Sequence, residues 1–157
     1  MTSRTMAIGL VALSLVVFGC NKSTTSSDTL PNTSMTSADA TALMSQLGGM
    51  DGVNKLADAF GANLSANPKL SSTLNPTTIN DAKQGLANEV AKVSGATPPY
   101  PGVSLLNALS GKGLDKDGVK AVEDALSSAA DTMNLGSQTK ASLKAIMEPI
   151  SKSLIGG

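Results

Sequence analysis

Residues 47–64 read Leu47-Gly-Gly-Met-Asp-Gly-Val-Asn-Lys-Leu-Ala-Asp-Ala-Phe-Gly-Ala-Asn-Leu64, and they carry the clearest structural signal in the 157-residue chain. The Gly-Gly pair is typical of a helix end, because glycine readily adopts the backbone conformation that terminates helices. Apolar residues then recur at intervals of three and four, which places them on one helical face: Val53, Leu56, Ala57, Phe60 and Leu64. The sequence here predicts a helix that ends at the glycines and a second, amphipathic helix that begins near Asp51.

Helical periodicity extends from about residue 38 to the end of the chain. We expect a first helix to begin at Ser37 or Asp39, and Asn67-Pro68 to open a short helical turn. The sequence Thr78-Ile-Asn-Asp81 resembles a capping box, so a longer helix is expected after it. Residues 95–102 contain three prolines and predict a rigid loop.

Three further helical segments are expected in the last third of the chain. The first is short and covers 103–109. Asp115 or Asp117 should cap a long helix, and Gly136-Ser137 should separate that helix from a final one. Pro149 lies inside the final helix and should kink it, because proline lacks a backbone N–H. The sequence therefore predicts an all-α domain over residues 38–157, long enough for one hydrophobic core.

The N-terminal segment has a different character. An apolar run of 14 residues follows Arg4 and ends at Cys20, the only cysteine in the chain. A basic start, a short apolar core and a small residue before the cleavage point are typical of a secretory signal. A permanent membrane-spanning helix, which needs roughly 20 apolar residues, is the weaker alternative. Because a cysteine follows directly, the pattern resembles a bacterial lipoprotein signal, with residues 1–19 removed and Cys20 lipidated. Ordinary secretion with an unused thiol is the other alternative.

This resemblance implies a location. Residues 20–37 hold the lipidated cysteine and a Ser/Thr-rich stretch, which predicts a flexible tether. Two or more acyl chains on Cys20 would give stable anchoring. Asn21 stands where an aspartate often retains lipoproteins at the inner membrane. The expected location is therefore the bacterial cell envelope, lipid-anchored at the outer membrane and facing the periplasm or the cell surface.

Composition excludes several classes of function. The chain has 12 basic and 12 acidic residues and no histidine, and loss of the signal removes only Arg4 from this balance. Scattered lysines and very few aromatic residues argue against nucleic-acid binding. Without histidine or a free thiol there is no Cys-His pair and no Ser-His-Asp triad, so we expect no enzymatic activity. Asp115, Asp117 and Asp124 are better explained as a cap and a solvated helix face than as a metal site, and no metal is expected.

The order of the motifs resembles a group I truncated haemoglobin over about residues 43–155. Four motifs match the family's pattern in order: Leu47-Gly-Gly, Asp58-Ala-Phe60, Asn67-Pro68-Lys-Leu70 and Pro99-Tyr100-Pro101-Gly102. The late Met147-Glu-Pro149 also fits the family's last helix. The resemblance implies a truncated-globin-like helical fold. An unrelated bundle rich in alanine and leucine is the alternative.

The positions that the resemblance assigns to haem binding are changed in this chain. The iron-binding histidine falls at Leu109, and the distal tyrosine that follows Phe60 falls at Gly61. Haem iron needs a strong axial ligand, which an apolar side chain cannot provide. Polar distal residues of the family would stand among residues 84–88. Tyr100 is expected to pack its loop, and four methionines are expected to fill the core rather than bind iron: Met44, Met50, Met133 and Met147.

The sequence therefore predicts a membrane-anchored exported lipoprotein with a degenerate, haem-less truncated-globin domain that acts as a binding or structural module. No cofactor is expected. The membrane is the expected partner, reached through the lipid anchor, and an apolar small molecule or an envelope protein is the further candidate. The alternative function is a haem- or oxygen-binding globin-like protein with a non-histidine axial ligand.

Replacement of Cys20 tests the lipoprotein prediction. Cells fed a clickable fatty acid should label the wild-type protein, and Cys20→Ser should abolish the label, because the thiol is the predicted site of acylation. Gel fluorescence after click coupling measures both. Equal labelling of the two proteins would refute the prediction.

Overall fold

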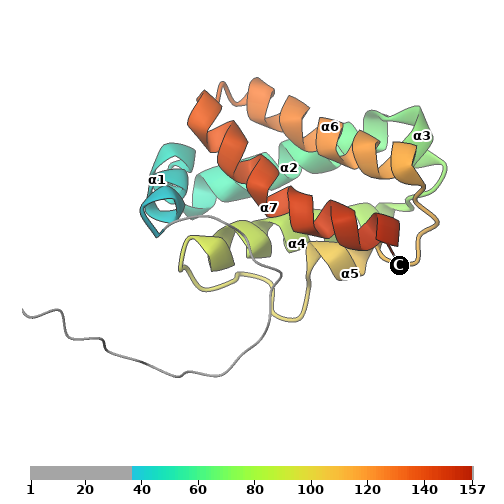
Figure 1. Cartoon of the computed structure of the whole chain (residues 1–157), viewed down its shortest axis with the longest axis horizontal. Helices are drawn as coiled ribbons and strands as arrows, with labels where there is room; N and C mark the ends of the chain where they lie inside the picture. Colours follow the sequence, from blue (N-terminus) through green and yellow to red (C-terminus); the bar gives the residue numbers. More distant parts are fainter. Residues whose placement is uncertain (1–36, 157) are drawn as a thin grey trace, which may run out of the picture.

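The computed structural model describes residues 37–156, and in this range the chain forms α-helices and no strand (Figure 1). The seven helices of this range are α1 (Ser37–Leu47), α2 (Met50–Ala66), α3 (Pro68–Ser71), α4 (Pro76–Val93), α5 (Leu105–Leu109), α6 (Lys116–Thr132) and α7 (Ser137–Gly156). The all-α prediction is confirmed. The predicted signal peptide 1–19, Cys20 and the tether lie outside the described residues, apart from Ser37, which begins α1.

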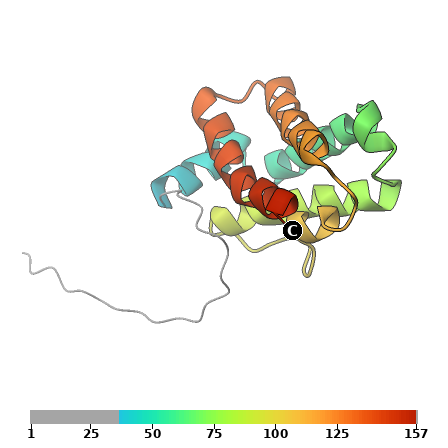
Figure 2. The same ribbon diagram turned by 45° about the vertical axis from the view of Figure 1, so that its right-hand side comes forward.

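Helix α2 occupies the centre of the structure. It packs on α4 and on α6, which lie on opposite sides of it in two views (Figures 1 and 2). Its apolar face is fully enclosed, since Val53, Leu56, Phe60 and Leu64 are at most 1% exposed. Helix α7 packs along α6 and also contacts α1, α4 and α5. The periodicity read from residues 47–64 therefore locates the centre of the core.

Most helix ends lie where the sequence predicts them. Gly48 and Gly49 have φ angles of 83° and 76° and separate α1 from α2. Asn67 caps α3, because its side chain accepts a hydrogen bond from the backbone N–H of Lys69. Of the two aspartates considered for α6, Asp115 is the cap, with its Oδ1 2.7 Å from the backbone N of Gly118.

The expected start of α4 at the Thr78 capping box is wrong. The helix begins two residues earlier, at Pro76, and Asn75 caps it by accepting a 2.8 Å hydrogen bond from the backbone N–H of Thr78. Proline suits the first helical position, since its φ angle is already helical and its missing N–H would have no partner there. Thr78 is buried. It lies in the first turn of the helix rather than before it.

The final helix is continuous through Pro149. Proline at this position cannot donate to the carbonyl of Ala145, so one intrahelical hydrogen bond is lost. Met147 and Ile150, on either side of Pro149, are buried, and their packing holds the helix against the core at this point.

Helices α4 and α5 touch backbone to backbone at Gly85. A Cβ atom at this glycine would lie 2.4 Å from the backbone N of Leu105 and 2.6 Å from its Cα. These separations are far below van der Waals contact, so only glycine permits the approach. Leu105 and Leu109 of α5 then lie in the core, at most 1% exposed.

Substitution of Gly85 should therefore destabilise the fold. Gly85→Ala is expected to lower the free energy of unfolding by about 2 kcal/mol, because the backbone of α5 must move away. Chemical denaturation followed by circular dichroism measures the change.

Gly61→Ala is the matched control, because the atoms nearest to a Cβ there belong to the flexible stem of Lys83 and not to the backbone. Its stability should stay within about 1 kcal/mol of the wild type, since alanine favours a helix over glycine. Equal stability of Gly85→Ala and wild type would contradict the close contact.

Candidate functional site

The interior position that the resemblance assigns to iron binding is filled by an apolar side chain. Leu109 is the last residue of α5 and is 1% exposed. It belongs to the same continuous apolar cluster as Phe60, Leu86 and Leu105. A leucine has no lone pair to give to a metal. Residue 109 therefore contributes packing and not coordination.

The second assigned position is covered from α4. Gly61 of α2 is buried, and the stem of Lys83 lies over it, so that a Cβ at Gly61 would be 2.4 Å from Cδ of Lys83. The Lys83 ammonium reaches the surface and pairs with Asp58 at 2.7 Å. A lysine can lie over apolar surface in this way while its charge stays solvated. The space that a distal tyrosine would need is therefore taken by Lys83, a role that no motif in the sequence indicates.

The geometry of α4 and α5 does not fit a haem. A haem bound at residue 109 and contacted from residues 84–88 would have to lie between these two helices. At Gly85 their backbones are too close even for one methyl group, since the next backbone atom, the carbonyl carbon of Ser104, would lie 2.7 Å from a Cβ. A macrocycle has no room at this point unless α5 moves away from α4.

A buried asparagine ties the proline-rich loop to α4. Asn88 is 1% exposed, and its Oδ1 accepts a 2.9 Å hydrogen bond from the backbone N–H of Tyr100. Its Nδ2 donates to the carbonyls of Tyr100 and Val103, the latter at 2.7 Å. Both donors and the acceptor of the amide are thereby used. Asn88 stands at a distal position of the family's pattern, yet its side chain is engaged by the loop.

The loop motif itself has a structural role. Tyr100, expected to pack its loop, is half-buried and packs against the core, while Pro99 and Gly102 are exposed. Gly102 has a φ angle of 82°, a conformation that favours glycine. The expected packing of the methionines is also confirmed, since Met147 is buried and the other three are packed against the core: Met44, Met50 and Met133.

Groups for other chemistry are sparse in residues 37–156. No three acidic, histidine or cysteine side chains in this range come together in a way that could hold a metal ion. None of the described helices is long and apolar enough to cross a membrane. The Lys152 ammonium, which is hydrogen-bonded to Glu148, lowers the pKa of that carboxyl, with a further contribution from the charge of Lys144. Glu148 is fully exposed, so this is a surface effect.

Comparison of the chain with protein-family models, with curated proteins and with solved structures finds no match. The resemblance to truncated haemoglobins therefore depends on the sequence motifs and on the order in which they occur.

The three hydrogen bonds that join Asn88 to the proline-rich loop, here called the Asn88 clamp, can be tested by mutation. Asn88→Ala should leave the N–H of Tyr100 and the carbonyl of Val103 without their partner, and the carbonyl of Tyr100 with only the N–H of Val103. The free energy of unfolding should fall by about 3 kcal/mol. Tyr100 is the only tyrosine and the chain has no tryptophan, so its fluorescence reports on this loop.

Asn80→Ala, an exposed change on the same helix, is the control and should alter stability by no more than about 0.5 kcal/mol. Unchanged fluorescence and stability in Asn88→Ala would show that the clamp contributes nothing.

Proposed function

We propose that this protein is a lipid-anchored module of the bacterial cell envelope whose helical domain is a truncated globin that has lost haem binding. The lipoprotein-like signal supports the anchoring, with Cys20 as the acylated residue and the outer membrane as the location. The order of the motifs along seven described helices supports the globin relationship. The domain then acts as a binding or structural module.

The contact between α4 and α5 carries the proposal. Loss of the histidine alone would leave an empty haem pocket, in which a different axial ligand could still bind the iron. Here the interface is closed as well, by Gly85 against Leu105 and by the buried side chain of Leu109. Apolar packing of this kind contributes about 1.5–3 kcal/mol for each large side chain. Opening the interface for haem would forfeit part of that stabilisation.

The residues present also argue against an enzyme. Histidine is the most frequent general base and cysteine a common nucleophile, and the chain has no histidine and only Cys20. The partners that fit are the membrane, through the anchor, and an apolar small molecule or another envelope protein. No cofactor is part of the proposed function.

Haem binding through a non-histidine ligand is the rival function. It would require Tyr100 or a methionine to reach iron. The backbone of Tyr100 is held by Asn88, and Met147 is packed in the core. Either residue would have to leave these contacts before it could coordinate a metal.

A haemin titration separates the two functions. The wild-type protein should give no saturable one-to-one shift of the Soret band, because it offers neither a ligand nor a cleft. Leu109→His should also fail, since it restores the ligand without reopening the α4–α5 contact. Absorption spectra recorded during the titration measure both.

Ala62→His is the control for binding of haemin iron to any exposed histidine, because residue 62 is exposed on α2. Any weak spectral change in Leu109→His should be matched by this variant. Tight stoichiometric binding by the wild-type protein would overturn the proposal and favour the rival function.

A further inference from the structure

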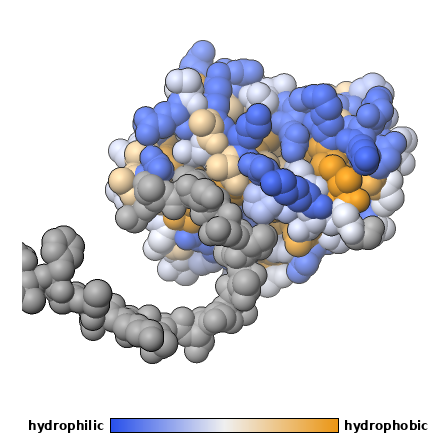
Figure 3. Space-filling model, viewed as in Figure 1, coloured by the Kyte–Doolittle hydropathy of each residue, from blue (hydrophilic) through white to orange (hydrophobic). Residues whose placement is uncertain are grey.

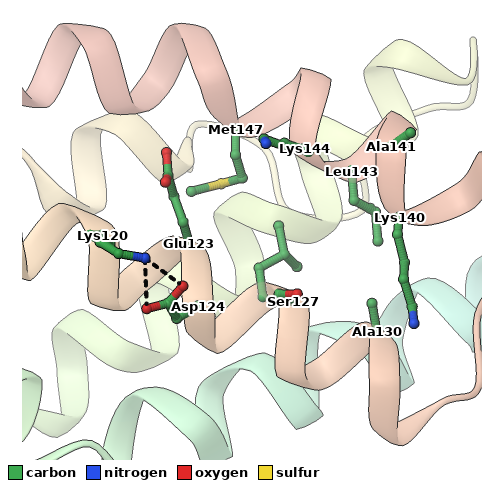
Figure 4. A pocket seen from close by; sticks show the side chains of 11 residues that line it. Lys120, Glu123, Asp124, Ser127, Ala130, Lys140, Ala141, Leu143, Lys144 and Met147 are labelled. Carbon is green, nitrogen blue, oxygen red and sulfur yellow. Dashed lines mark hydrogen bonds and ion pairs between the residues drawn. The ribbon is translucent and has the colours of Figure 1, made fainter. Parts of the chain in front are cut away.

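A groove of about 350 Å³ runs along the surface between α6 and α7 (Figure 4). Its floor is apolar and consists of Leu126, Leu143 and Met147, each no more than 3% exposed. Its rim is charged on both sides. Figure 3 shows hydrophilic side chains over much of the face that carries these helices, with smaller apolar areas between them. The groove does not involve Leu109 or Gly61.

Two of the rim residues form no ion pair with another described residue, although the charge of Lys144 also acts on Glu148 one turn along α7. Lys120 pairs with Asp124 at 3.2 Å, and Lys140 pairs with Asp131, so these charges are largely compensated. Glu123 of α6 and Lys144 of α7 form no ion pair in this part of the chain. In Figure 4 they rise from facing helices on either side of the Met147 side chain. One negative and one positive side chain, neither in an ion pair, thus flank an apolar floor.

We propose that this groove binds a small zwitterion that carries an apolar group. The ammonium of the ligand would face Glu123, its carboxylate or phosphate would face Lys144, and its apolar group would lie on Met147 and Leu143. Small-molecule sites commonly combine an apolar lining with a few placed polar groups in this way. A free amino acid or peptide and an ethanolamine lipid headgroup share this chemistry.

Other occupants fit the groove less well. A ligand with a single charge would satisfy one rim residue and leave the other without a partner. A second copy of the chain would find little apolar surface to bury, because the floor is already almost enclosed and Ile155 is the one exposed large apolar residue among those described. A stable protein interface needs roughly 1,000 Å² with an apolar centre. The zwitterion uses both charges and needs only a small apolar contact.

The inference does not depend on the proposed function. It involves α6 and α7 only, whereas the loss of haem binding rests on α4 and α5. A haemin titration tests the proposed function, and a titration of the groove with zwitterions tests this proposal, so either can be contradicted without the other.

NMR of the full chain, labelled with ¹³C at the methionine methyl groups, tests the proposal. Met147 lies in the groove, and Met147→Leu assigns its signal. The probes are the dipeptide leucyl-leucine, as a free zwitterion, and lysophosphatidylethanolamine below its micelle concentration, as a lipid headgroup. At least one probe should shift the Met147 signal saturably. We expect a Kd on the order of 1 mM, because only two exposed charges and a small apolar contact would stabilise the complex. Whichever probe binds identifies the source.

Single-charge probes and charge-removing variants complete the test. Hexanoate and hexylammonium should shift the signal less than the zwitterion does. Glu123→Gln and Lys144→Gln should each weaken zwitterion binding about three- to fivefold, as expected for exposed ion pairs. Lys112→Gln, an exposed change outside the groove, should leave it unchanged. No saturable shift with either zwitterion, equal binding of the single-charge probes, or unchanged affinity in both groove variants would overturn the proposal.

Discussion

The contact of α4 with α5 at Gly85 is the constraint on which the rest of the interior depends. It fixes the distance between the two helices at a value that only glycine allows, with a Cβ position 2.4 Å from the neighbouring backbone. Leu105 and Leu109 then join the buried core, where α5 packs on α4 and α7. The interior is consequently a packed apolar cluster, and any ligand that entered here would have to displace side chains that stabilise the fold.

A second consequence concerns how the proline-rich loop is held. In a haem protein the prosthetic group itself contacts the elements on both of its faces. In the proposed haem-less domain that organising role passes to the chain. Asn88 supplies three hydrogen bonds to the loop, and Lys83 covers Gly61 from the same helix. Both side chains come from α4, where Lys83 precedes Gly85 and Asn88 follows it in the sequence. In this arrangement the chain's own side chains hold α4, α2 and the loop together.

Much of the fold could be predicted from local sequence. The periodicity of α2, the Gly48-Gly49 break and the Asp115 cap are each set by residues within one or two helical turns, so the sequence alone locates them. The start of α4 was misplaced because two capping signals overlap, and Asn75-Pro76 prevailed over Thr78. The Asn88 clamp and the cover over Gly61 could not be predicted. Their partners lie 12 to 22 positions away, and only the tertiary fold brings them together.

Because the interior is packed with apolar side chains, the charged groups that a ligand could contact lie at the surface. In the described part of the chain the buried cluster offers no titratable group to a ligand apart from Glu89, which is paired with Lys92 at the edge of α4. The surface of α6 and α7, by contrast, carries both charges that form ion pairs and charges, such as Glu123 and Lys144, that form none. A charge without a partner costs little while it is solvated, so Glu123 and Lys144 do not destabilise the fold. They therefore remain available for a ligand. A pair of charges buried in the apolar interior would instead carry a large desolvation penalty.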